Sequence, residues 1–155
     1  MAHRITEADI EGAQRIWAGG IVEIGRAFLE QRDYRALARS MVDGLYGYQE
    51  GAVLFKPTKA REEPFRFSAT GAVSYFVGGE REYPEDHGFA LKPWTRVRFE
   101  NAAFLFRRDH ALAMGHYYFT DEDGEEMKVE FTFGYFRAEG SRLKIDLHHS
   151  SLPFS

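Results

Sequence analysis

Hydrophobic residues in the first third of the chain recur every three or four positions, which is the spacing of one face of a helix. Thr6 is a suitable N-cap for a long helix, and a second helix is expected to start at Asp33. The apolar stripe of the first helix is Ile10, Ala13, Trp17, Ile21, Ile24 and Phe28, and that of the second is Tyr34, Leu37, Ala38, Met41 and Leu45. The pattern predicts two amphipathic helices, the second ending where Gly44 and Gly47 interrupt it.

The middle of the chain predicts two short elements. Residues 52–55 favour a strand, which Pro57 should end because proline cannot donate a strand hydrogen bond. Thr58 then lies at a bend, where its hydroxyl can turn inward. Ser68 or Thr70 can start a short helix that includes Tyr75 and ends at the glycine pair 78–79.

The second half changes to the period of two that is typical of half-buried strands. The expected inward positions are Val97, Phe99, Asn101, Ala103 and Leu105, then Met127, Val129, Phe131, Phe133 and Tyr135, and finally Leu143, Ile145 and Leu147. With residues 110–120 they predict four successive strands, joined by polar turns at 107–109, 121–124 and 139–141. The order predicts an α+β fold, in which helices cover one face of a curved antiparallel sheet, in a single domain over residues 1–155.

Composition narrows the possible partners and chemistry. The net charge is -4, with 20 Lys and Arg scattered among 24 acids, so we expect no nucleic-acid partner. No stretch approaches the ~20 apolar residues of a membrane span, so we expect no membrane partner and a cytoplasmic location, the mature form of an exported protein being the alternative. The chain has no cysteine, which excludes thiolate nucleophiles and thiolate metal sites.

The last strand ends in two histidines followed by two serines, residues 148–151. Adjacent strand residues point to opposite faces, so His149 and Ser151 share one face and His148 and Ser150 share the other. Continuing the inward set through Leu147 favours His149 and Ser151 as the inward pair. A bulge before Pro153 would switch the faces.

Asn101 is a further candidate, because it interrupts an apolar inward set and a buried amide must find a partner. We expect it to line a cavity and to contribute to substrate binding.

Five segments together resemble one family. They are LFKPT (54–58), GAVSYFVGG (71–79), YPEDHGFALKPWTRVRFENA (83–102), VEFTFGYF (129–136) and LHHSSLP (147–153). These segments are similar to the iota class of carbonic anhydrases, which is related to the association domain of calcium/calmodulin-dependent kinase. The resemblance implies the NTF2-like cone, in which N-terminal helices and a curved sheet enclose a pocket.

The resemblance also implies a reaction, the reversible hydration of carbon dioxide to bicarbonate and a proton without a metal or other cofactor. Bicarbonate is held in this class by the hydroxyls of a Thr, a Tyr and a Ser, which match Thr58, Tyr75 and either Ser150 or Ser151. His149 is the expected proton carrier, because histidine has an ordinary pKa of ~6.5. His148 is expected to assist in substrate binding.

The spacing of the histidines predicts no metal site. His148 and His149 diverge on a strand, and a three-histidine zinc site would need His87, His110 or His116 brought close. The acidic turn at 121–124 lacks the alternating ligands of an EF-hand.

Each assignment has a structural alternative, in which the two histidines and Thr58 only stabilise the strand end and the turn, and Tyr75 packs in the core.

Two rival functions also remain. One is a non-catalytic oligomerisation module, and the resemblance in either case favours a homodimer or larger homo-oligomer. The outer face of the sheet, with Phe104, Phe106, Phe136 and Tyr118, is the expected contact. The other rival is an isomerase or cyclase, which would need an inward acid, whereas parity places Asp146 and Glu130 outward.

Overall fold

The N-terminal half of the chain supplies the helices and the C-terminal half supplies most of the sheet. In a computed structural model, which describes residues 4–139 and 142–155, the helices are α1 (Glu7–Leu29), α2 (Tyr34–Leu45) and α3 (Ala69–Val77), with two 3-10 turns, η1 (Gly47–Gln49) and η2 (Phe89–Leu91). The strands are β1 (Leu54–Lys56), β2 (Arg96–Phe106), β3 (His110–Thr120), β4 (Glu126–Arg137) and β5 (Leu143–Ser151). The predicted α+β class is confirmed. The predicted turn at 139–141 lies partly outside the described residues.

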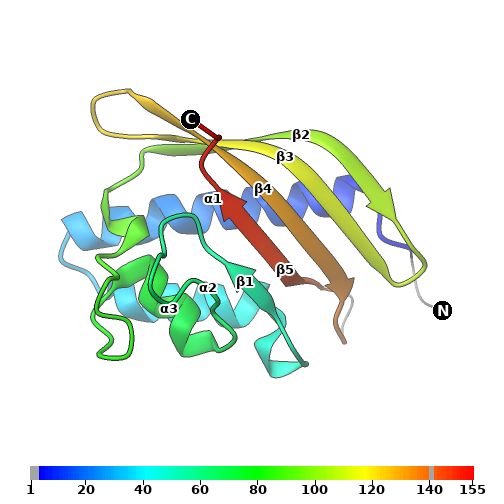
Figure 1. Cartoon of the computed structure of the whole chain (residues 1–155), viewed down its shortest axis with the longest axis horizontal. Coiled ribbons are helices and arrows are strands. Elements are labelled where there is room, and N and C mark those ends of the chain that lie inside the picture. The colour runs from blue at the N-terminus through cyan, green and yellow to red at the C-terminus, as the bar shows by residue number, and fades with distance from the viewer. Residues whose placement is uncertain (1–3, 140–141) are drawn as a thin grey trace.

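The strands form one sheet in the order β1-β5-β4-β3-β2, and the sheet curves over α1 (Figure 1). β2 to β5 pair antiparallel, as predicted, whereas β1 runs parallel to β5. This parallel pairing sets Lys56 opposite His149, so the turn that follows β1 lies beside the end of β5. The sheet therefore brings residues 57 and 58 next to the histidine and serine motif.

The first helix forms as its sequence predicts. Thr6 and Asp9 make a capping box, in which each side chain accepts from the backbone N–H of the other at 3.1 and 2.9 Å. The predicted stripe supplies Ile10, Trp17 and Ile21 to the core, each almost fully buried. Trp17 lies at the centre of this core and contacts aromatic rings of α3, β2, β3 and β4.

Two strands carry a single extra residue that reverses their alternation. In β2 the pairing moves from Asn101 to Ala103 while β3 advances by one residue, which leaves Ala102 as a bulge. In β5 the pairing moves from Ile145 to Leu147 while β4 advances by one, which leaves Asp146 as a bulge. Beyond each bulge the residues that face the helices are those that strict alternation places outside.

A glycine lies opposite each bulge and gives it room. A Cβ at Gly115 would lie 2.2 Å from Glu100 O, and a Cβ at Gly134 would lie 2.9 Å from both Asp146 Oδ1 and Leu147 Cβ. Glycine in a strand interior commonly marks such a bend or close approach. In each case the glycine of the opposing strand therefore allows the bulge to form.

The β2 bulge corrects the expected outer face of the sheet. Phe104 and Phe106 pair with the buried Ala113 and Ala111, so they lie on the helix side rather than outside. Leu105 and Met114, at 39% and 57% exposure, are exposed apolar residues of the outer face. Self-association through this face stays a prediction. Within the described residues, no helix is both long enough and apolar enough to cross a membrane.

Candidate active site

A chain of hydrogen-bonded hydroxyls lies under the end of β5. Thr58 Oγ1 contacts Ser150 Oγ at 2.5 Å, and Tyr117 of β3 donates to the same Ser150 oxygen at 2.6 Å. The Tyr117 oxygen also contacts His148 Nε2 at 3.0 Å. Four residues from three separate segments therefore share one buried polar network.

Tyr75 borders the same space from α3. Its hydroxyl accepts from the backbone N–H of Lys59 at 3.1 Å, which joins α3 to the turn that carries Thr58. A small cavity of about 10 Å³ lies among Thr58, Tyr75, Ser150 and the surrounding rings. That volume is close to the minimum needed by one water molecule. The enclosed pocket predicted from the sequence is therefore present but nearly filled by side chains.

His148 is held between two phenyl rings. Its centroid lies 4.6 Å from that of Phe55 and 4.0 Å from that of Phe133, and both pairs are nearly parallel. The Tyr46 hydroxyl contacts Nδ1 at 2.8 Å and accepts from the indole N–H of Trp17 at 2.9 Å. Both nitrogens of the ring are thus engaged inside an apolar stack.

The hydrogen-bond pattern assigns the tautomer of His148. Because Tyr117 donates its hydrogen to Ser150, its oxygen is free to accept from a protonated Nε2. Nδ1 is then unprotonated and accepts from Tyr46. Burial, and to a smaller extent the neighbouring His149, holds the pKa of His148 well below its usual value, so the ring is neutral at pH 7.

The tyrosines of the network are also neutral. Burial raises the pKa of Tyr46, Tyr75 and Tyr117 above that of an ordinary phenol, although hydrogen bonds act in the opposite direction. All polar groups around the cavity therefore carry no charge at neutral pH. They can orient a small polar molecule through hydrogen bonds, and they cannot retain an added proton.

The turn that carries Thr58 is anchored by charged groups behind it. The carboxylate of Glu85 accepts three successive backbone N–H groups, of residues 61, 62 and 63, at 2.7, 3.0 and 2.8 Å. Arg66, fully buried, makes a bidentate pair with Asp86 at 2.7 and 2.8 Å. Charge-assisted pairs of this kind are directional. They fix the backbone between β1 and α3 and so the position of Thr58.

The β5 bulge corrects the predicted inward pair. His148 and Ser150 are buried at 2% and 1% exposure, whereas His149 is exposed and Ser151 is half-buried on the other face. Strict alternation along β5 would place His149 and Ser151 inward. Asp146 is an extra residue in the strand, and it reverses the faces of the residues that follow it. His149 borders a shallow outer groove with Phe65 and Phe67 instead.

Asn101 is also placed differently from the expectation. Its amide exchanges two hydrogen bonds with Gln14 of α1, at 2.7 and 3.0 Å, and this pair lies in a groove beside β2. Asn101 thus joins helix and sheet and does not border the cavity at Thr58. Conversely, Tyr46 and Tyr117 belong to the network without having been singled out by any motif.

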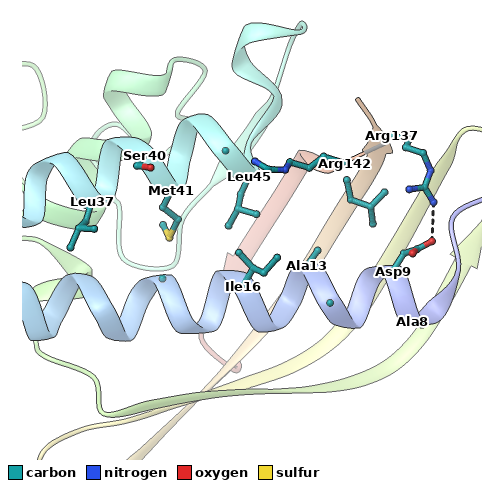
Figure 2. A pocket seen from close by; sticks show the side chains of 14 residues that line it. Ala8, Asp9, Ala13, Ile16, Leu37, Ser40, Met41, Leu45, Arg137 and Arg142 are labelled. Carbon is teal, nitrogen blue, oxygen red and sulfur yellow. Dashed lines mark hydrogen bonds and ion pairs between the residues drawn. The ribbon is translucent and has the colours of Figure 1, made fainter. Parts of the chain in front are cut away.

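A larger groove lies elsewhere, between α1 and α2 (Figure 2). It measures about 550 Å³, and its walls are mostly apolar residues such as Ile16, Leu37 and Met41. Its polar groups include the Asp9–Arg137 ion pair at 2.9 Å (Figure 2). Volume alone does not make a site, and we place the chemistry at the smaller cavity because convergent polar side chains are buried there.

Among residues 4–139 and 142–155, no three His, Asp or Glu side chains are grouped so that they could hold a metal ion.

Sequence comparisons identify the family of the chain. The profile of a family described as metal-independent carbonic anhydrase matches residues 8–152. A metal-independent carbonic anhydrase from Nostoc sp. is 39% identical over 153 residues, which are 97% of this chain and 75% of that protein.

Solved structures extend the comparison. The crystal structure of a cyanobacterial iota-carbonic anhydrase complexed with bicarbonate matches with a TM-score of 0.95 and 39% identity, covering 98% of this chain and 94% of the other. A protein of the NTF2-like family from Streptomyces avermitilis matches with a TM-score of 0.58 and 11% identity over 96% of each chain, which supports the NTF2-like fold alone. By the extent of the sequence match, the chain is a member of the metal-independent carbonic anhydrase family.

Proposed function

We propose that this carbonic anhydrase binds bicarbonate and orients the attacking water through Thr58, Tyr75 and Ser150. The observation that carries the proposal is the 2.5 Å contact between Thr58 and Ser150 at the wall of a buried cavity that Tyr75 also lines. In the hydration direction the oxygen of water forms a bond to carbon, one C=O bond becomes a C–O⁻ bond, and one O–H bond of water breaks. Hydroxyl donors aimed at the developing oxyanion stabilise that step.

Tyr117 and His148 act as positioning residues in this proposal. The Tyr117 hydroxyl donates to Ser150 and leaves the Ser150 hydrogen available for Thr58 or for a ligand. His148 fixes Tyr117 from the other side, and the Phe55 and Phe133 rings fix His148. Ser150 is thus oriented before substrate binds, in a site from which bulk water is excluded.

Bicarbonate has four heavy atoms, so it is larger than the water-sized cavity, and binding requires lining side chains to move. Tyr75 and Phe89 stand between the cavity and a wider groove outside it. Movement of these two rings would open the cavity on that side. The network of β5 and β3 borders the cavity but not this groove, and it need not change.

The deciding experiment compares the two serines of the motif. Ser150→Ala removes a hydroxyl at the cavity, and we expect kcat for carbon dioxide hydration to fall about 10²–10³-fold, as for loss of one oxyanion donor. Ser151→Ala is the matched control and should stay near the wild-type rate, because Ser151 lies on the other face of β5. Stopped-flow assays of both variants with a pH indicator measure this difference, and equal effects would contradict the proposed site.

The same assay after exhaustive chelation tests the metal-independent reaction. We expect the wild-type rate to be unchanged, because no proposed step uses a metal ion. Complete loss of turnover on chelation, restored by adding a divalent cation, would contradict the mechanism.

A further inference from the structure

A second groove begins where the cavity ends. It has a volume of about 320 Å³ and shares Tyr75 and Phe89 with the cavity lining. Its other borders come from the turn after β1 and from the segment before β2, including Lys59, Glu85, His87 and Lys92. Unlike the cavity, this groove contains charged and titratable side chains.

The proposed reaction releases a proton that the cavity cannot keep. His148 has a pKa well below its usual value because it is buried, and Tyr75 and Tyr117 are already protonated because burial raises their pKa. Hydroxyls of Thr58 and Ser150 can pass a hydrogen along but cannot store a charge. The proton must therefore be accepted outside the network, on a path that leads to solvent.

Most groups along the groove are unsuited to accept it. The ammonium groups of Lys59 and Lys92 have no lone pair to offer. The Glu85 carboxylate is occupied by three backbone N–H groups, which lower its pKa, and Asp86 is paired with Arg66 and also accepts from Ser74 at 2.5 Å. His87 is exposed at the groove and carries an imidazole, whose neutral form has one unprotonated ring nitrogen that can accept a proton.

The other histidines of the described residues lie away from this route. His110 is paired with Asp146 at 2.8 Å on the outer face of the sheet, and His116 lies 3.9 Å from Glu130 on that same face. His149 borders the outer groove beside β1, and His148 is enclosed by aromatic rings. His149 is also exposed, and its groove shares Phe55 and His148 with the cavity lining. Those two rings are stacked on each other and held in the network, whereas Tyr75 and Phe89, on the side of His87, are the rings proposed to move.

We propose that the groove beside Tyr75 is the proton exit of the enzyme and that His87 is its proton acceptor. The inference rests on the proposed function and adds the step that follows carbon–oxygen bond formation. Water molecules in the groove pass the proton from the cavity to the free nitrogen of His87, which then gives it to buffer. In the reverse direction His87 supplies the proton that converts bicarbonate to carbon dioxide and water.

The test uses His87→Gln, which keeps the size and polarity of the side chain but cannot accept a proton. In stopped-flow hydration assays at low concentration of a bulky buffer, kcat should fall about 10²-fold or more, within the range of general acid–base effects. The ratio kcat/KM should stay near wild type, because it reports carbon–oxygen bond formation before proton release. Added imidazole should restore kcat. His116→Gln is the matched control, and its kcat should equal that of the wild type.

The outcomes separate this inference from the proposed function. An active wild-type enzyme whose kcat is unchanged by His87→Gln at every buffer concentration overturns the role of His87. A fall that imidazole does not reverse, or an equal fall in kcat/KM, also overturns it, because a structural role would produce those results. An inactive wild-type chain overturns the proposed function and this inference with it.

Discussion

Tyr117→Phe tests the buried network by removing one oxygen and leaving the ring in place. The Tyr117 hydroxyl links His148 to Ser150, at 3.0 and 2.6 Å. Its loss leaves Nε2 of a fully buried imidazole without an acceptor. Ser150 keeps Thr58 as its partner, so the penalty falls mainly on His148.

The magnitude follows from the cost of an unsatisfied buried donor, about 1–3 kcal/mol. For a chain of 155 residues each kcal/mol lowers Tm by about 2–4 °C, so we expect a decrease of roughly 2–12 °C. The rate should fall as well, because Ser150 loses the donor that orients it. We expect kcat to decrease about tenfold to a hundredfold, the upper figure being the cost of a misplacement of about 1 Å.

Tyr118→Phe is the matched control, since the neighbouring tyrosine points to the other face of the same strand. Its hydroxyl donates to Glu100 at 3.2 Å in solvent, and its ring contact with Arg98 survives the change. The free energy of unfolding should change by no more than about 0.5 kcal/mol. Thermal unfolding and stopped-flow hydration of both variants measure the contrast. Similar effects of the two substitutions, or no effect of Tyr117→Phe, would refute the network as the basis of the site.

Two further predictions concern stability. His148 stays neutral in the folded protein, whereas in the unfolded chain it takes up a proton below about pH 6.5. The free energy of unfolding should therefore decrease by about 1.4 kcal/mol for each pH unit below 6.5. Above that pH it should not depend on His148. Urea unfolding between pH 5 and 7.5 measures this slope, which His148→Gln should remove. Gly134→Ala should cost about 1–3 kcal/mol, because the new Cβ meets Asp146 and Leu147 at 2.9 Å. Gly19→Ala is the control for this substitution and should instead stabilise α1 by about 0.5–1 kcal/mol, because nothing lies within 4 Å of its Cβ.

The results that would contradict these two predictions are specific. An equal slope in wild type and His148→Gln would mean that another group controls the acid response. A Gly134→Ala variant as stable and active as the wild type would mean that the β5 bulge does not depend on the glycine opposite it.

The helices and the antiparallel run of β2 to β5 could be predicted from the sequence, because they follow from local periodicity, capping and polar turns. The parallel pairing of β1 with β5 was not predicted. The inward pair of the motif could not, because the serine and the histidine are each doubled. Either register presents one His and one Ser to the cavity, so residue type gives no information about which pair is inside. The signal that was available is Gly134, a glycine within an otherwise bulky strand, opposite the extra residue Asp146.

Tyr117 was missed for a different reason. It lies 33 positions from Ser150 in sequence, and its alternating strand resembles any other half-buried strand with an aromatic residue inside. Its role depends on the pairing of β3 with β4 and of β4 with β5, which stacks Tyr117 over the motif across an intervening strand. Contacts of this kind arise from the assembled sheet and leave no local pattern.

Because the buried site is uncharged, the groups that orient substrate and the group that accepts the proton must lie in different places. The Phe55 and Phe133 rings that hold His148 in one orientation also remove the water that an imidazolium would need, so orientation is gained at the expense of basicity. A base placed among the hydroxyls would be charged for part of each cycle and would draw water into the cavity. Orientation by neutral donors on β3 and β5 and proton acceptance in the solvated groove beyond Tyr75 are therefore complementary requirements, and a residue that serves one of them is unsuited to the other.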